Sequence, residues 1–242
     1  MRIVSLSCLL LGLVVTAGCG RLPGQPTPSQ VPLEPQQVTN FVALYRENCA
    51  GCHGSHGQGN AALSLSNPVY QALVDDATLR RVIAQGVPHS LMPAFARSAG
   101  GFLTDAQVDI LVRGLRANWS KPNAAGSAKP PPYAAPTNAP GEARRGEAVF
   151  AKFCARCHGA DGTGGGKMGS IVDGSYLALI SNQGLRTTVI AGRPERGHPD
   201  WRNCLPGEPM SPAQVSDVVA WLISKRPAQS GQPYASSSET RN

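Results

Sequence analysis

The sequence has few aromatic residues, few charged residues and no long apolar run beyond its first residues. Aromatic side chains make up 5% of the 242 residues, so a single large core lined with aromatic rings is not expected. A cofactor at the centre of each of several small domains would compensate for that shortage. The apolar run is N-terminal and short, which excludes a protein that crosses a membrane several times.

Glycine and proline are abundant instead, with 27 and 21 residues. This composition indicates compact, loop-rich domains joined by stretches that do not fold by themselves. The length fits one large domain or two small ones of about 100–150 residues each. The net charge of +7 is compatible with docking on an acidic partner, or with a solvated surface that has no preferred partner. Nothing in the sequence is patterned for binding nucleic acid.

The N-terminus has the organisation of an export signal. Arg2 precedes a mostly apolar stretch at residues 3–15, and small residues lead up to Cys19. These features predict a secretory signal peptide over residues 1–18. Residues 19–38 are rich in proline and glutamine and are expected to form a tether between that segment and the first domain.

The small residues before Cys19 resemble the bacterial lipobox, in which cleavage exposes a cysteine that becomes lipid-modified. Thr16 stands where that motif usually has leucine. The resemblance implies that Cys19 anchors the chain to a membrane. The alternative is an ordinary signal peptide cut near Ala17, which would leave Cys19 as a free thiol.

The pattern Cys-x-x-Cys-His occurs twice. Its members are Cys49, Cys52 and His53 in one copy, and Cys154, Cys157 and His158 in the other. Two thiols at this spacing can bond to the two vinyl groups of one haem, and the adjoining histidine can then serve as the proximal iron ligand. A thioredoxin-like dithiol needs no histidine in this place, and a four-cysteine zinc site would have to join pairs about a hundred residues apart. The pattern therefore predicts two covalently bound haem c groups.

The two motifs belong to a longer repeat. The motifs lie 105 positions apart, and Ala106-Gln107-Val108 matches Ala213-Gln214-Val215 at an offset of 107. Each unit is expected to contain short helices: one that enters the motif, one that ends near Gly86 or Gly192, and one that begins after Thr104 or Ser211. Between the units, residues 120–140 hold six prolines and should form a semi-extended linker.

Both halves resemble class I cytochrome c domains, and the whole resembles tandem dihaem cytochromes c on a lipoprotein anchor. The resemblance rests on the two Cys-x-x-Cys-His motifs, the downstream Met92-Pro93-Ala94-Phe95 and the terminal helices. It implies an all-α fold. The expected organisation is a signal peptide at 1–18, a lipid-anchored tether at 19–38, cytochrome c domains at 39–118 and 142–226, a Pro-rich linker at 119–141 and a disordered tail at 227–242.

The remaining axial ligands follow from the same resemblance. Met92 lies in the Met-Pro loop that supplies the distal ligand in this family, with His89 as a competing candidate. In the second half, alignment of Gly192 on Gly86 places His198 where relatives usually have methionine. His198 is therefore expected to be the distal ligand of a haem held by two histidines. Its rivals are Met210, which would be an apolar contact before the last helix, and Met168 in the Gly-rich loop, or else an open iron.

The family also implies a close crossing of the first and last helices of each domain, with glycine on the first against an aromatic residue on the last. The second half fits, with Gly146 and Trp221. In the first half the aligned pair is Phe41 and Gly114, so the large and small residues are exchanged. Because a close crossing needs only that the volumes sum correctly, we expect Phe41 to pack over Gly114.

Three further side chains carry expectations. Arg80 and Arg186 align with each other and are expected to be exposed helix arginines, the alternative being contact with haem propionates. Cys204 has no partner in the two domains and is expected to be buried rather than to crosslink a dimer.

The function implied by these residues is transfer of single electrons by a membrane-anchored dihaem cytochrome c, with no bond of a substrate made or broken. The expected partners are redox proteins, either a membrane complex or a soluble carrier, and the location is the periplasmic or outer face of a bacterial membrane. Methionine ligation should give the first haem the higher reduction potential. The alternatives are a dihaem peroxidase, a haem subunit of a dehydrogenase, or a bound subunit of an oxidase or photosynthetic complex.

Overall fold

The computed structural model describes residues 32–126, 128–165 and 168–227. The signal peptide, Cys19 and all but one residue of the tail at 227–242 lie outside these ranges, as does most of the tether. The chain divides by its internal contacts into two units, Met1–Val38 and Thr39–Asn242. In the first unit, a short 3-10 helix spans Pro35–Gln37. The second unit contains both repeats.

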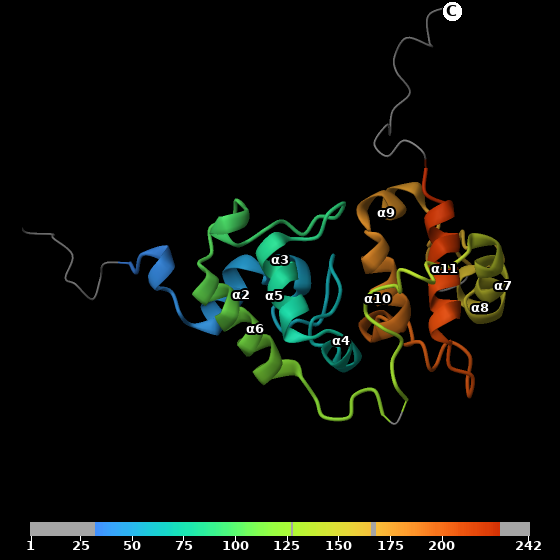
Figure 1. Ribbon diagram of the computed structural model, residues 1–242, viewed down its shortest axis with the longest axis horizontal. Helices are drawn as coiled ribbons and strands as arrows, with labels where there is room; N and C mark the ends of the chain where they lie inside the picture. Colours follow the sequence, from blue (N-terminus) through green and yellow to red (C-terminus); the bar gives the residue numbers. More distant parts are fainter. Residues whose placement is uncertain (1–31, 127, 166–167, 228–242) are drawn as a thin grey trace, which may run out of the picture. The chain divides into compact units, whose positions relative to one another are not determined.

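The first repeat is a set of short helices around one core (Figure 1). Its elements are α2 (Phe41–Asn48), α3 (Ala50–His53), α4 (Pro68–Leu73), α5 (Asp76–Gln85), the 3-10 helix η2 (Arg97–Ala99) and α6 (Asp105–Trp119). The described residues otherwise contain isolated bridges and no strand. The all-α fold is therefore confirmed.

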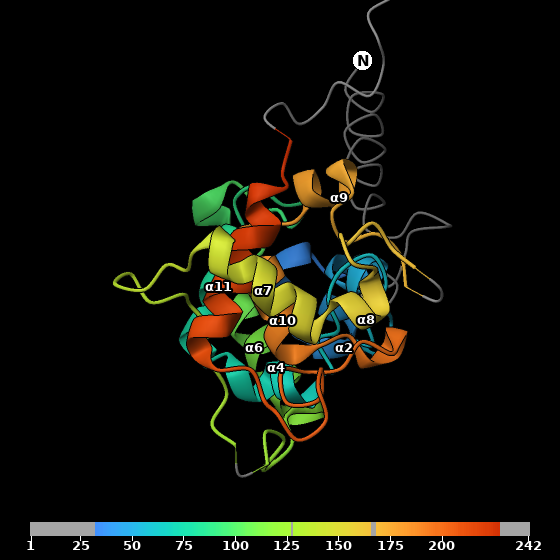
Figure 2. The same ribbon diagram turned by 90° about the vertical axis from the view of Figure 1, so that its right-hand side faces the viewer.

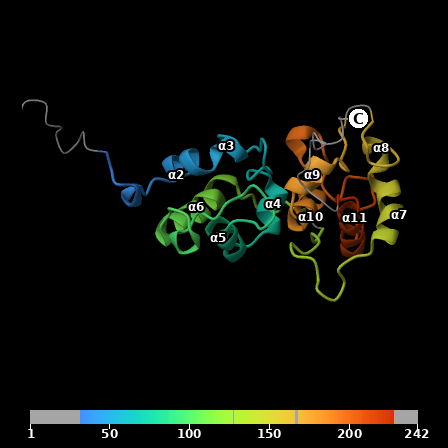
Figure 3. The same cartoon turned by 90° about the horizontal axis from the view of Figure 1, so that it is seen from above.

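The second repeat has the same α-helices in the same order, whereas its 3-10 helix lies before His198 and η2 lies after Met92. Its elements are α7 (Ala143–Phe153), α8 (Ala155–His158), α9 (Gly174–Leu179), α10 (Asn182–Ala191), the 3-10 helix η3 (Pro194–Arg196) and α11 (Pro212–Ser224). Figure 2 shows the first and last of these, α7 and α11, side by side, and Figure 3 shows α5 beside α6 and α10 beside α11. The duplication in the sequence is thus a duplication of structure.

The last helix of each repeat begins where the sequence predicts. Thr104 caps α6 and Ser211 caps α11, each in a reciprocal pair of hydrogen bonds with the glutamine three residues later. Such a cap typically contributes about 1 kcal/mol. The apolar faces that follow are buried, including Val108 and Val215.

The exchanged helix crossing is confirmed. A Cβ atom on Gly114 would overlap the ring of Phe41, and a Cβ on Gly146 would overlap the carbonyl oxygen of Asp217 and lie 2.7 Å from Cβ of Trp221. The crossing in the second half brings the two backbones together, whereas in the first half the Phe41 ring lies between the helices, so the bulky side chain comes from opposite helices.

An aromatic residue that the alignment did not identify fills the place of the Trp221 ring in the first half. Trp119 stacks edge-on against Tyr45 at 5.1 Å between ring centroids, and its ring lies on Gly57. In the second half, Trp221 stacks on Phe150 at 4.2 Å. The residue that aligns with Trp221 is Gly114, and Trp119 stands five positions after it. Alignment therefore does not reveal that both tryptophan rings stack on an aromatic ring of the first helix.

The linker is not a free tether throughout, because its centre is docked on the second half. Pro131 is fully buried, and Arg186 donates to the backbone carbonyls of Pro132 and Tyr133 at 2.9–3.1 Å. Arg186 is itself only 2% exposed, so the expectation of an exposed side chain is wrong. Arg80 is half-exposed, as expected, and pairs with Asp105 and Asp109.

The difference between the two arginines has a local cause. Asp105 and Asp109 align with Pro212 and Ser216, so the second half has lost both acids. Arg186 donates to the Ser216 hydroxyl and uses its other donors on the linker. Burial lowers the pKa of the Arg186 guanidinium, yet a guanidinium stays charged in proteins. Its charge is thus held by carbonyl oxygens.

We expect Arg186→Met to lower the free energy of unfolding of the second half by about 3 kcal/mol, because it removes the hydrogen bonds of Arg186 to the linker carbonyls and to the buried Ser216 hydroxyl. Arg80→Met is the matched control, since it removes partly exposed ion pairs worth less than about 1 kcal/mol. Denaturant unfolding followed by circular dichroism measures both. If both variants lost the same free energy of unfolding, Arg186 would not be the more strongly stabilising of the two arginines.

Candidate haem sites

The histidine of each motif is placed by a helix that breaks at the first cysteine of that motif. Helix α2 ends before Cys49 and α3 begins after it, and Cys154 separates α7 from α8 in the same way. Both histidines are 8% exposed. Nδ1 of His53 lies 2.9 Å from the carbonyl oxygen of Leu63, and Nδ1 of His158 lies 3.3 Å from that of Gly169.

These hydrogen bonds leave the other ring nitrogen of each histidine available. When Nδ1–H donates to a carbonyl, Nε2 carries the lone pair that a metal ligand needs. Burial lowers the pKa of His53, which favours the neutral imidazole. The arrangement is suited to an axial iron ligand.

The motif cysteines do not have the properties of a redox dithiol. Burial raises the pKa of Cys49 to about 12, and burial does the same for Cys154. Catalytic dithiols need a lowered thiol pKa. Cys49 and Cys154 therefore lack the lowered thiol pKa that disulfide exchange needs.

The loops that carry Met92 and His198 share one backbone hydrogen bond. Val87 N–H donates to the Met92 carbonyl at 3.0 Å, and Arg193 N–H donates to the His198 carbonyl at 2.9 Å. Each loop folds back on the glycine that ends the preceding helix. A Cβ on Gly86 or Gly192 would lie within 2.5–2.7 Å of this returning backbone. Met92 and His198 therefore occupy equivalent positions.

The second half brings its two histidine rings together. The ring centroids of His158 and His198 are 5.9 Å apart, with an interplanar angle of 47°. A metal–nitrogen bond to imidazole is about 2 Å long, so two rings on opposite sides of one metal have centroids roughly 6 Å apart. Nδ1 of His198 is buried without a hydrogen-bond partner. These residues fit a haem iron between them.

The rival ligands have other surroundings. Met210 is 2% exposed in the core, and its N–H donates to the Trp201 carbonyl. Met168 is half-buried, and its methyl lies 3.9 Å from a Cβ on Gly197, next to His198. His89 is exposed, whereas Met92 is half-buried. Met168 is thus a rival whose methyl group approaches the residue before His198.

Cys204 is half-buried, whereas the sequence predicted that it would be buried. Its thiol donates to the Asp200 carbonyl at 3.4 Å, and burial raises its pKa to about 11. It forms no disulfide with any other cysteine of the described ranges.

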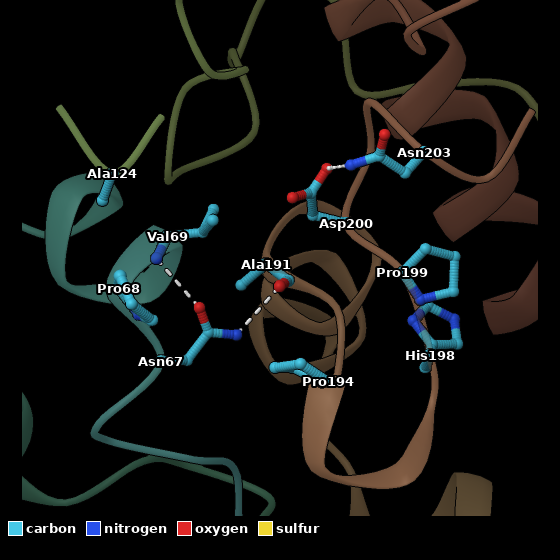
Figure 4. Close-up of a pocket in the computed structure, with 10 residues that line it drawn as sticks. All are labelled: Asn67, Pro68, Val69, Ala124, Ala191, Pro194, His198, Pro199, Asp200 and Asn203. Carbon is cyan, nitrogen blue, oxygen red and sulfur yellow. Dashed lines mark hydrogen bonds between the residues drawn. The ribbon is translucent and has the colours of Figure 1, made fainter. Parts of the chain in front are cut away.

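A cavity of about 330 Å³ lies beside the second ligand loop, and residues of the first half contribute to its wall (Figure 4). Asn67 caps α4 with its side-chain oxygen and donates from its amide nitrogen to the Ala191 carbonyl at 2.9 Å. Asn67 is 4% exposed. It ties the first half to the end of α10, a role that the sequence pattern did not indicate.

The fold and the repeated motif define a protein with two cytochrome c-like domains. The profile of the family described as cytochrome c oxidase, cbb3-type, subunit III matches residues 36–113 and 141–222. These segments make up more than half of the chain, which therefore belongs to this family. Two covalently bound haem c groups are accordingly its cofactors.

Two curated relatives are similar to this chain. The cbb3-type cytochrome c oxidase subunit CcoP of Cereibacter sphaeroides is 29% identical over 153 residues, which are 56% of this chain and 44% of the relative. The subunit of the same name from Rhodobacter capsulatus is 34% identical over 98 residues, 37% of this chain and 33% of the relative. The chain thus matches less than half the length of each.

A looser likeness is to a chain of the Kuenenia stuttgartiensis reducing HAO-like protein complex. The TM-score is 0.42 at 18% sequence identity, over 86% of this chain and 100% of that chain. Within the described ranges, no helix is both long and apolar enough to span a membrane.

Proposed function

We propose that this protein is a dihaem electron carrier in which both irons are six-coordinate. Cys49 and Cys52 attach the first haem, with His53 and Met92 as axial ligands. The second haem is attached by Cys154 and Cys157, with His158 and His198 as axial ligands. The observation that carries the proposal is the 5.9 Å separation of the His158 and His198 rings.

The residues of each site would hold one haem and cover both faces of its iron. When bound, the haem iron supplies exchange of one electron between its ferrous and ferric states. The carbonyls of Leu63 and Gly169 fix the rings of His53 and His158 through Nδ1. On the other side, the returning loops hold Met92 and His198 in place, so that no open position is left for a substrate.

This closure favours a carrier over a dihaem peroxidase or a haem subunit of a dehydrogenase, because catalysis at iron needs a vacant or displaceable position. The ligand sets also differ between the halves. A thioether favours ferrous iron more than a second imidazole does, so the first haem is the one with the higher potential. With these ligand sets, an electron would rest at the site of His53 and Met92 and would reach it through the site of His158 and His198.

The proposal extends to organisation and location. Cytochrome c domains at 39–118 and 142–226 are joined by the linker at 119–141, and Cys19 carries a lipid after removal of residues 1–18. This places the domains on the periplasmic or outer face of a bacterial membrane. The relatives are subunits of a cbb3-type cytochrome c oxidase, which supports a membrane complex or a soluble carrier as the redox partner.

Carbon monoxide binding to the reduced protein tests the proposal. Six-coordinate haems with protein ligands on both sides are expected to bind carbon monoxide slowly or not at all, and both haems should have low-spin spectra. Rapid binding at either haem would favour an enzyme. A potentiometric titration of the same sample should resolve two haems of different potential.

A further inference from the structure

The loop before His198 contacts the first half of the chain. Arg193 donates through Nη2 to the carbonyls of Ala62 and Asn60, at 3.1 and 3.2 Å. Arg196 donates through Nη2 to the Asn60 carbonyl at 2.8 Å. Two guanidinium groups of the second half therefore share the Asn60 carbonyl of one loop of the first half, and Arg193 also reaches the Ala62 carbonyl of that loop.

That loop of the first half is the one that orients His53. Ala62 N–H donates to the Cys52 carbonyl at 3.0 Å, and the next residue, Leu63, accepts the hydrogen bond from Nδ1 of His53. Gly59 N–H donates to the His53 carbonyl at 2.8 Å. A change in the position of Ala62 is thus transmitted to the proximal histidine of the first haem.

At its other end, Arg193 is fixed to His198. The two residues exchange backbone hydrogen bonds in both directions, at 2.9 and 3.0 Å. Glu195 accepts a hydrogen bond from Nε of Arg193 at 2.8 Å, and its carboxylate lies 3.1 Å from a Cβ on Gly59. The guanidinium of Arg193 is therefore oriented before it reaches the carbonyls of the first half.

The first half has no equivalent of this arrangement. Val87 aligns with Arg193, and His89 and Ser90 align with Glu195 and Arg196. Val87 retains the backbone hydrogen bond to the ligand residue but offers no side-chain donor. The contact is a feature of the second copy, formed where the two copies meet.

We propose that Arg193 is a positioning residue that couples the two haem sites. It joins the loop that orients His53 to the loop that carries His198. A change in the position of either of these two loops therefore reaches both haem sites. This inference rests on the proposed function, because it takes His53 and His198 as iron ligands.

The test uses the full-length dihaem protein carrying Arg193→Gln. Loss of the donor pair is expected to speed hydrogen exchange of the Ala62 amide at least tenfold. It is also expected to shift the reduction potential of the first haem, although the substitution lies in the second half. Arg144→Gln removes the same charge from an exposed position on α7 and should leave both quantities unchanged.

Arg193→Lys separates position from charge. Lysine keeps the charge but cannot present a planar fork to two carbonyls, so the faster exchange at Ala62 is expected to persist. Unchanged exchange in both variants would overturn the proposal, as would a potential shift in Arg193→Gln without faster exchange, which would reduce Arg193 to an electrostatic role. Failure of the electron-carrier proposal is separate, since it would appear in the unmodified protein as rapid carbon monoxide binding.

Discussion

Replacing His198 by methionine is expected to raise the reduction potential of the second haem toward that of the first. The imidazole donates more strongly to ferric iron than a thioether does, and axial ligands change haem potentials over a range of about 0.8 V. Met92 occupies the equivalent position in the first half, so the loop can present a methionine with the same backbone hydrogen bond. Potentiometric titration of both haems measures the shift.

The control for this experiment is Met168→Leu. The methyl group of Met168 approaches the residue before His198, and leucine preserves the apolar volume of Met168 without a sulfur atom. We expect the second haem of this variant to keep its potential and its low-spin spectrum. If the reduction potential of the second haem changed in Met168→Leu and not in His198→Met, the distal ligand would be Met168.

Substituting Gly146 by alanine is expected to destabilise the second half by about 3 kcal/mol or more. The added Cβ would overlap the carbonyl oxygen of Asp217, which is backbone and cannot rotate away. The Asp217 side chain also accepts hydrogen bonds from Arg145 and from Glu142 N–H, which holds α11 against α7. Thermal unfolding followed by haem absorbance of the second domain measures the loss.

Gly114→Ala provides the comparison in the first half. There the added Cβ meets the ring of Phe41, a half-buried side chain that can shift, so the expected loss is about 1–2 kcal/mol. Phe41→Leu combined with Gly114→Ala should recover part of it. A larger loss at Gly114 than at Gly146 would contradict this account of the two crossings.

Local sequence rules predicted much of this fold because they concern groups close along the chain. The capping pairs of Thr104 and Ser211 and the glycines that end α5 and α10 lie within a few residues of what they satisfy. The exchange of Phe41 and Gly114 was also predictable, because steric volume at a helix crossing is conserved whichever helix supplies it.

Contacts that join distant segments could not be predicted in the same way. Arg116 donates to the carbonyls of Gln71 and Val74, and Arg226 donates to those of Leu177 and Ile180, which align with them. Arg226 nevertheless stands several positions beyond the residue that aligns with Arg116. A long side chain can reach one acceptor from different turns of a helix, so alignment misses such pairs.

The sequence by itself determined that the chain is a duplicated helical unit, with a haem-attachment motif in each copy and different residues at the equivalent loop positions of Met92 and His198. These features follow from spacing and local geometry. Only the tertiary structure decided that Arg186 is buried against the linker, that Trp119 replaces the ring of Trp221, and that Arg193 joins the loop that orients His53 to the loop that carries His198. Each depends on which backbone carbonyl or ring comes within reach, and that is set by packing across the fold.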